Sequence, residues 1–176
     1  MKDDDATAQN FNISIAVTED FMEAVREDRE WQLIDPSSGE VAFTLPARQI
    51  WDEIVQSAWK TGDPGLYFID ESNRTNPTPH LGNLESTNPC GEVPLLAHEA
   101  CNLASIDLGK FVHANEFDFV GLEEITRKGA RFLDNVVTVN KFPAIEVQEA
   151  VAATRKTGLG VMGWHDALIQ MSVPYE

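Results

Sequence analysis

Residues 11–20 read FNISIAVTED, and this stretch decides the class of fold. Apolar side chains alternate with small or polar ones from Phe11 to Val17, which is the period-two pattern of a β-strand. Thr18 has a side chain suited to an N-cap, and the acidic residues that follow it favour the first turn of a helix. The stretch therefore predicts a strand that runs directly into a helix, which continues to about Arg26.

Strands and helices continue to alternate along the chain. Apolar runs flank the turn at 35–39 and predict a hairpin over 31–34 and 41–45. Helical spacing predicts further helices, which begin at Pro46 and end before Gly62, and then cover 122–136, 145–155 and 164–171. We expect two more strands over 103–108 and 159–162, the second of them buried, and mostly loop over 62–94. The fold class is therefore α/β, with five to seven strands.

The balance of charge excludes one class of partner. The 176 residues include 13 basic and 29 acidic side chains, a formal net charge of −16. A chain this acidic lacks the broad basic surface that binding to a nucleic acid polymer requires. It also has no apolar run long enough to span a membrane, and its start, residues 1–5, lacks the features of a secretory signal. We therefore expect a cytoplasmic protein that binds no membrane.

Two motifs suggest chemistry that their surroundings do not favour. Residues 158–163 read GLGVMG and fit a dinucleotide-binding fingerprint. A charged helix end precedes them where that fingerprint needs a strand, so close backbone packing is the better interpretation. A zinc site can be drawn from Cys90, His98, Cys101 and His80, but its spacing matches no common pattern, and we predict no metal site.

A third stretch, STNPCGE over residues 86–92, differs in kind. In an extended or tightly looped segment, residues two apart point to the same side, so Asn88, Cys90 and Glu92 can converge on one small ligand. Pro89 fixes its own backbone angle, and Gly91 lets the backbone approach a ligand closely. On spacing alone, a turn around a buried cysteine remains open as the alternative.

Four ordered motifs together resemble a known family. They are NPTPHLG over 76–82, TNPCGE over 87–92, EACNLASI over 99–106 and GLGVMG over 158–163. The set resembles the catalytic subunit of ribonucleotide reductase, most closely the adenosylcobalamin (vitamin B12)-dependent class II, from residue 10 to residue 175. The resemblance implies a single partial domain over 1–176: the central segment of a ten-stranded α/β barrel, incomplete in this chain, with a finger loop around 84–94.

The resemblance also implies roles for individual residues. Cys90 would carry a thiyl radical, generated with adenosylcobalamin, that takes the 3′ hydrogen from the ribose. Glu92 would act as general base on the 3′-OH, while Asn88 would bind the substrate and steady Glu92, and Gly91 would lie against the substrate. Cys101 would be one of two thiols that supply the reducing equivalents. Because sulfur–hydrogen and carbon–hydrogen bonds are close in strength, the hydrogen exchange is nearly reversible, and the protein contributes positioning.

The implied partners are a ribonucleoside di- or triphosphate, the missing segments of the catalytic subunit, a dithiol reductant such as thioredoxin, and a second copy in a homodimer of the complete enzyme. We expect the isolated chain to be inactive, because the cysteine that pairs with Cys101 in the family lies upstream of the matched region. Two alternatives stay open. One is a class that uses a separate metal-containing radical subunit, which Tyr67 and Tyr175 do not decide. The other is a non-catalytic nucleotide-binding or interaction module.

Overall fold

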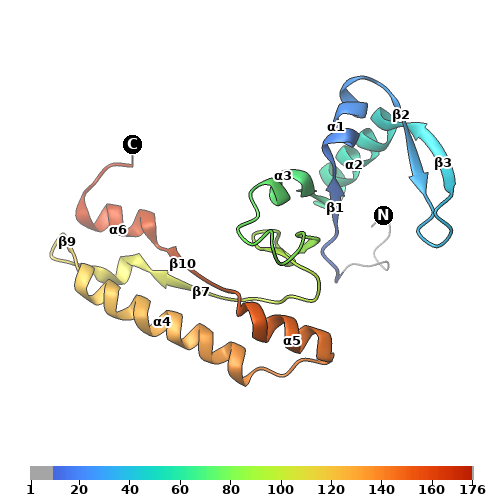
Figure 1. Cartoon of the computed structure of the whole chain (residues 1–176). Helices are drawn as coiled ribbons and strands as arrows, with labels where there is room; N and C mark the ends of the chain where they lie inside the picture. Colours follow the sequence, from blue (N-terminus) through green and yellow to red (C-terminus); the bar gives the residue numbers. More distant parts are fainter. Residues whose placement is uncertain (1–9, 176) are drawn as a thin grey trace. The chain divides into compact units, whose positions relative to one another are not determined.

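The protein is described here by a computed structural model that covers residues 10–175. The N-terminal residues 1–5, which support the expected cytoplasmic location, lie outside the described residues. The chain divides into two compact units, with the boundary between Leu96 and Ala97 (Figure 1). Each unit is built on one pair of parallel strands. A single partial domain over 1–176 stays a prediction.

The first unit is organised by the parallel pairing of β1 (Ser14–Val17) with β4 (Gly65–Phe68). Parallel neighbours need a long crossover connection, because the chain must return to the same end of the sheet. Here the crossover consists of α1 (Glu19–Arg26), the hairpin of β2 (Glu30–Ile34) and β3 (Val41–Pro46), and α2 (Ala47–Thr61). Pro46 is the last residue of β3 and occupies the N-cap position of α2, so the helix begins one residue later than expected. Gly62 ends the helix in a left-handed conformation.

The predicted strand-to-helix stretch is confirmed and forms the core of the first unit. The Thr18 hydroxyl accepts a hydrogen bond from the backbone N–H of Phe21 at 3.2 Å, as an N-cap should. Phe21 is buried, and its ring meets that of Trp31 edge-on, with 5.3 Å between centroids. The other buried members of this core are Val17, Ala24, Val25 and Ala47. The apolar face of α1 is thus what joins the helix to the strand pair.

The segment expected to be mostly loop contains a helix that periodicity did not reveal. Between β4 and the short pair β5 (Ser86–Thr87) and β6 (Pro94–Leu95) lies α3 (Ile69–Arg74). Its sequence, IDESNR, has no apolar stripe, and none of its residues is buried. Asn73 fixes it instead: the side-chain amide donates to the Leu84 carbonyl at 2.9 Å and accepts from the Leu84 N–H at 2.7 Å. A polar tertiary contact of this kind leaves no periodic signal in sequence.

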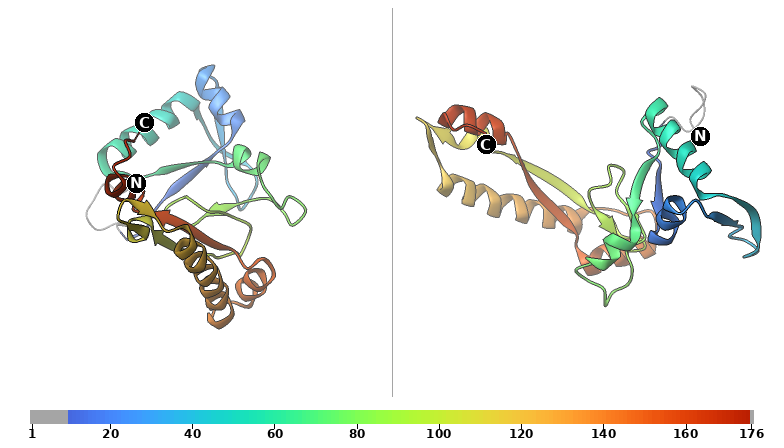
Figure 2. Two further views of the ribbon diagram at one scale, coloured as in Figure 1. Left: turned by 90° about the vertical axis from the view of Figure 1, so that its left-hand side faces the viewer. Right: turned by 90° about the horizontal axis from the view of Figure 1, so that it is seen from above.

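The second unit is organised by the parallel pairing of β7 (Asn102–Asp107) with β10 (Thr157–Met162), in which Asn102 lies opposite Thr157. Helix α4 (Phe119–Val139) packs along both strands (Figure 2). The remaining elements are η1 (Leu108–Phe111), β8 (Val112–His113), β9 (Glu116–Phe117), α4 (Phe119–Val139), α5 (Ile145–Thr154) and α6 (Trp164–Met171). The helices predicted over 122–136, 145–155 and 164–171 are therefore confirmed, with shifted ends for the first two.

Two expectations about the strands are wrong. We expected 159–162 to be buried, but Val161 is 62% and Met162 54% exposed, because β10 has a single strand neighbour within residues 10–175. We expected five to seven strands, whereas the described chain has ten, in five two-stranded sheets. Four of them, β5, β6, β8 and β9, have two residues each and are too short to show a period.

The described residues thus form a mixed α/β fold with no closed barrel, as expected for an incomplete part of one. The glycine motif lies inside β10 and its end, not in a turn after a strand. The interpretation as close packing holds at Gly158 and Gly163 but not at Gly160, and the strand is not buried. A Cβ at Gly158 would lie 2.4 Å from Leu103 Cδ2. In the part of the chain that the structure covers, no helix is both long and apolar enough to cross a membrane.

The same motif gives a first prediction. Gly163 has φ +67°, and a Cβ there would lie 2.2 Å from Asp107 Oδ1, so Gly163→Ala should lower the free energy of unfolding by about 1 to 3 kcal/mol. Gly160→Ala is the matched control, because its Cβ would meet only Ser105 Oγ at 4.0 Å, and we expect a change within about 1 kcal/mol. Urea denaturation followed by circular dichroism measures both. Equal stabilities of the two variants would contradict this account.

Candidate functional site

The finger loop, residues 84–94, is closed around one asparagine. Strands β5 and β6 pair in antiparallel fashion, and the chain turns between them over residues 88–93. The backbone N–H of Asn88 donates to the Val93 carbonyl at 3.2 Å, and its carbonyl accepts from the Gly91 N–H at 3.0 Å. The Asn88 side-chain oxygen accepts from the Val93 N–H at 2.9 Å. Gly91 has φ +85°, which glycine adopts without strain. Asn88 therefore fixes the shape of the loop.

Cys90 and Glu92 stand on this loop with their side chains open to solvent. Cys90 is a free, exposed cysteine, so the alternative of a turn around a buried cysteine is wrong. Within residues 10–175 neither the Cys90 thiol nor the Glu92 carboxylate makes a hydrogen bond or an ion pair. No hydrogen bond joins Asn88 to Glu92 there either, since the Asn88 oxygen is used by Val93. The turn thus brings the three residues into one loop and leaves the sulfur and the carboxylate available.

A cavity of about 240 Å³ lies between the start of the finger loop and one face of the first strand pair. Asn12, Ser14 and Ala16 line it from alternate positions of the first strand and the residues before it, and Tyr67 lines it from β4. Loop residues 85–89 complete it. Sequence motifs did not reveal these lining residues, although the small side chains at positions 12, 14 and 16 share one face in the same alternation that predicted the strand.

Asn12 also ties the loop to the strand pair. Its side-chain amide donates to the carbonyl of Pro89 at 3.3 Å, across 77 residues of sequence. Pro89 immediately precedes Cys90, so this bond fixes the peptide that leads to the sulfur. Tyr67 is held in turn, because its hydroxyl forms a 2.8 Å hydrogen bond with that of Ser72.

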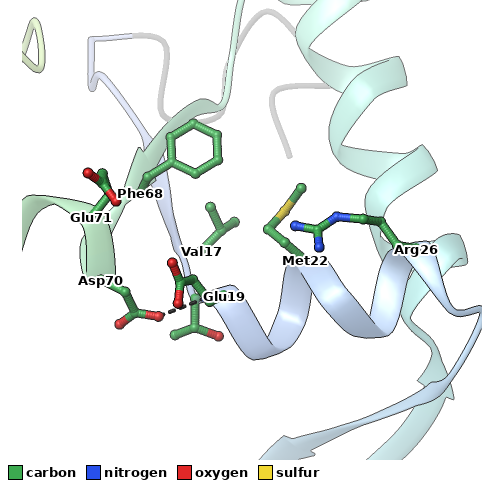
Figure 3. Close-up of a pocket in the computed structure, with 8 residues that line it drawn as sticks. Val17, Glu19, Met22, Arg26, Phe68, Asp70 and Glu71 are labelled. Carbon is green, nitrogen blue, oxygen red and sulfur yellow. Dashed lines mark hydrogen bonds between the residues drawn. The ribbon is translucent and has the colours of Figure 1, made fainter.

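A second cavity of about 330 Å³ lies at the carboxyl end of the same strand pair (Figure 3). Its lining combines the acidic groups of Glu19, Asp70 and Glu71 with Arg26 and with the apolar side chains Val17, Met22 and Phe68. The first backbone N–H of α1, at Glu19, donates to Asp70 Oδ2 at 2.7 Å. Arg74 forms ion pairs with Glu19 and Glu71. Because the Asp70 carboxylate and the Thr18 hydroxyl already accept from backbone N–H groups at this helix start, the cavity does not favour an anionic ligand. The finger-loop side of the sheet is therefore the stronger candidate site.

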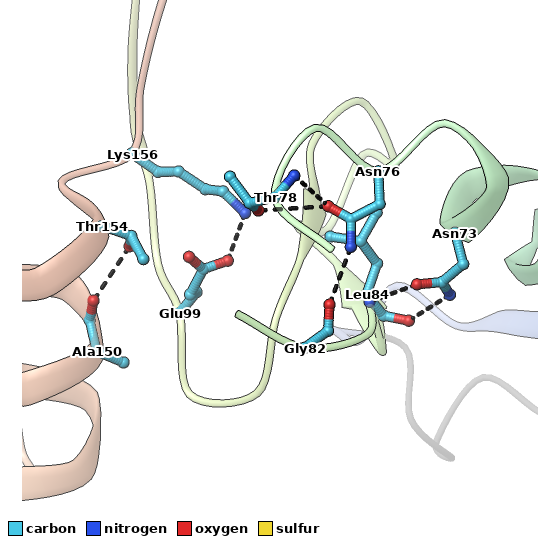
Figure 4. A network of polar contacts seen from close by, with 9 residues as sticks. All are labelled: Asn73, Asn76, Thr78, Gly82, Leu84, Glu99, Ala150, Thr154 and Lys156. Carbon is cyan, nitrogen blue, oxygen red and sulfur yellow. Dashed lines mark hydrogen bonds and ion pairs between the residues drawn. The ribbon is translucent and has the colours of Figure 1, made fainter. Parts of the chain in front are cut away.

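Cys101 belongs to the second unit, where it immediately precedes β7 and is half-buried. Two residues earlier, the Glu99 side chain is 1% exposed and forms an ion pair with Lys156, which is 25% exposed (Figure 4). Sequence reasoning missed this pair because the two residues are 57 positions apart and meet only through the pairing of the strands that follow them.

Of the residues drawn into a possible zinc site, His98 has φ +61° at an exposed turn. Within residues 10–175 no three histidine, cysteine or acidic side chains lie close enough together to hold a metal ion.

Comparisons with known proteins support the resemblance. The family model for the ribonucleotide reductase barrel domain matches residues 1–176. The chain is 48% identical, over 94% of its length, to a vitamin B12-dependent ribonucleoside-diphosphate reductase of Thermoplasma acidophilum. It is 44% identical, over 95% of its length, to a protein of the same name from Mycobacterium tuberculosis. A ribonucleoside-diphosphate reductase large subunit of Caenorhabditis elegans is 30% identical over 96% of the chain. The chain spans 22%, 24% and 25% of the length of these three relatives.

The loop geometry gives a second prediction. Asn88→Ala removes the acceptor of the Val93 N–H, and loss of a hydrogen bond of about 1 kcal/mol should speed amide exchange at Val93 about fivefold. Asn88→Asp keeps an oxygen at the same place and should keep the protection. Hydrogen–deuterium exchange of residues 86–95 measures both variants, and unchanged exchange in Asn88→Ala would show that the side chain does not hold the loop.

Proposed function

Because this chain belongs to the ribonucleotide reductase family and carries barrel-domain sequence, we propose that it forms the central catalytic segment of an enzyme that reduces ribonucleotides to 2′-deoxyribonucleotides. The observation that carries the proposal is the exposed Cys90 thiol on a loop that Asn88 and Asn12 fix beside a cavity. A reactive sulfur needs access and a fixed position, and this loop supplies both.

Cys90 would exchange a hydrogen atom with the substrate. Its sulfur loses a hydrogen atom, takes the hydrogen from C3′ of the ribose, and returns that hydrogen after the reduction. Adenosylcobalamin, which the B12-dependent relatives support as the cofactor, would supply the initial radical when bound. The open position of the thiol suits this exchange, because a radical source must reach the sulfur from outside the loop. The higher identity to the B12-dependent relatives favours this source over a separate metal-containing subunit.

Glu92 would accept the proton of the 3′-OH while the radical stands on C3′. Asn88 has its oxygen bound to Val93, so its amide N–H groups remain to donate to the substrate, and it would steady Glu92 through the shape of the loop. Beside Gly91, the space that a Cβ would occupy has no atom within 4 Å, which leaves room for a sugar to approach the backbone.

Cys101 would take part in the reduction at C2′. The C2′ hydroxyl leaves as water, and the two electrons and two protons that the reaction consumes come from two thiols, which become a disulfide. The chain has two cysteines, and Cys90 is engaged in the hydrogen exchange, so the second reducing thiol would come from another part of the enzyme. A thioredoxin-like dithiol would then restore both thiols.

The complete enzyme would bind further partners. Its substrate would be a ribonucleoside di- or triphosphate, and its active form a homodimer in which the other segments of the catalytic subunit complete the barrel. A cytoplasmic location suits Cys90 and Cys101, which must be thiols to act.

The roles of the two cysteines can be separated by experiment. In the complete catalytic subunit with adenosylcobalamin, a ribonucleotide and a dithiol, Cys90→Ser should lower deoxyribonucleotide formation at least about a thousandfold and abolish hydrogen exchange at the 5′ carbon of the cofactor. Cys101→Ser should keep that exchange but stop repeated turnover, because a reducing thiol is lost. Full turnover by Cys90→Ser would refute the proposed function, and an assembled enzyme that binds nucleotide without any turnover would favour a non-catalytic module.

The general base can be tested in the same assay. Glu92→Gln keeps the size of the side chain but accepts no proton, and we expect kcat to fall about 10²- to 10⁴-fold while substrate binding changes little. Glu40→Gln, in the exposed turn of the β2–β3 hairpin, makes the same change of charge and should leave kcat unaltered. A normal kcat for Glu92→Gln would remove Glu92 from the mechanism.

A further inference from the structure

We propose that the ion pair between the buried Glu99 carboxylate and Lys156 is a positioning pair that balances charge beside Cys101 and so sets the reactivity of its thiol. The inference rests on the proposed function only for the biological use of that thiol. It concerns three residues of the second unit, all at the point where the parallel strands β7 and β10 begin.

Strand register places these residues together. Asn102 lies opposite Thr157 in the parallel pair, and Cys101 and Lys156 are the residues that immediately precede these two, so both stand where neighbouring strands begin. Glu99 precedes Cys101 by two positions and is bound by the Lys156 ammonium group. Cys101 thus immediately precedes the strand that neighbours the one after Lys156, and it stands two positions after the Glu99 carboxylate along the chain.

The burial of the Glu99 side chain strengthens the electrostatic effect of the pair on its surroundings. The Glu99 side chain is 1% exposed, and a carboxylate removed from water to this extent is costly unless a counter-charge binds it. Charges in such surroundings act over longer distances than exposed charges, because less water screens them. The pair therefore presents Cys101 with two opposed charges whose effects largely cancel.

Three polar residues flank this pair and Cys101 along the chain. Arg155 precedes Lys156, but its guanidinium is bound to Asp134 at 2.7 Å and to the Thr138 hydroxyl at 2.9 Å. His98 precedes Glu99 and lies at an exposed turn. Asn102, which follows Cys101, has a buried side-chain oxygen without a hydrogen-bond partner in the described part of the chain. The buried Glu99 carboxylate and the partly exposed Lys156 are therefore the charges through which the thiol can be tuned.

The balance of the two charges suits a thiol that must stay unreactive until the reduction step. A thiolate reacts with oxidants and electrophiles far more readily than a thiol does, and a nearby unbalanced cation favours the thiolate. Glu99 offsets the cation that the strand register brings beside Cys101. The thiol would then remain protected until it gives its electrons and proton to the reduction and joins its partner sulfur in a disulfide.

The test uses the chain with Cys90→Ser, in which Cys101 is the single thiol. The rate of alkylation by iodoacetamide at neutral pH is compared for Glu99→Gln, Lys156→Met, Lys156→Arg and the double variant Glu99→Gln/Lys156→Met. Glu99→Gln leaves the cation unbalanced, so alkylation should be about threefold faster or more. Lys156→Met should leave the rate unchanged or lower, and Lys156→Arg and the double variant should stay within about twofold of the parent.

The direction in which the alkylation rate changes distinguishes charge tuning of the thiol from a purely structural role of the pair. If the pair only holds the strand ends together, both single changes loosen the segment and both speed alkylation, and that result would overturn the proposal. An unchanged rate in Glu99→Gln would overturn it too. The exposed pair Glu124 and Lys128 on α4, 2.5 Å apart, is the matched control, and Glu124→Gln and Lys128→Met should leave the rate unchanged. Circular dichroism confirms that each variant is folded.

Failure of this proposal and failure of the proposed function are separable. The alkylation assay needs no substrate, cofactor or turnover, so its outcome does not depend on whether the complete enzyme reduces ribonucleotides. Conversely, a complete enzyme that turns over normally with Cys101→Ser would remove the biological use of the thiol and leave the alkylation result as it stands.

Discussion

Parallel strand pairing is the constraint on which the rest of this structure depends. Each unit has one parallel pair, β1 with β4 or β7 with β10, and a parallel pair requires the chain to cross over before it can return. Helices α1 and α2 with the hairpin between them form one crossover, and the segment from η1 to α5 forms the other. Because the crossovers take up most of the chain, little remains for the sites, which occupy the segments just outside the strands: the finger loop after α3 and the short approach to β7.

Polar side chains hold both of these segments. Asn73 binds the chain at Leu84, Asn88 closes the finger loop and Asn12 ties its Pro89 to the strand pair. In the second unit the buried Glu99 carboxylate forms an ion pair with Lys156 at the start of the strands. Apolar packing is non-directional, whereas hydrogen bonds fix orientation, so segments that must present a sulfur at a set place depend on amides and charges. The apolar cores stabilise the crossovers, whereas these hydrogen bonds and the ion pair position the finger loop and the approach to β7.

Much apolar surface remains open on the chain as described. Trp59 is 89%, Val120 79% and Phe132 65% exposed, and the strands of both parallel pairs have a single neighbour each within residues 10–175. Contiguous apolar surface and unpaired strand edges are costly in water and normally mark contacts with further structure. A chain that spans 22% to 25% of the length of its relatives fits this picture, since the rest of a barrel would cover such surfaces.

The sequence by itself determined the α/β class, the strand-to-helix start at 11–26, the main helices and the loop that carries Asn88, Cys90 and Glu92, because periodicity, caps and turn residues are local signals. It did not determine α3, the two-residue strands or the exposure of β10, which depend on contacts with distant residues. Only the tertiary structure showed that Asn88 binds Val93, that Asn12 binds Pro89 and that Glu99 meets Lys156. Hydrogen-bond partners and strand register depend on how the chain returns in space, and spacing along the sequence does not contain that information.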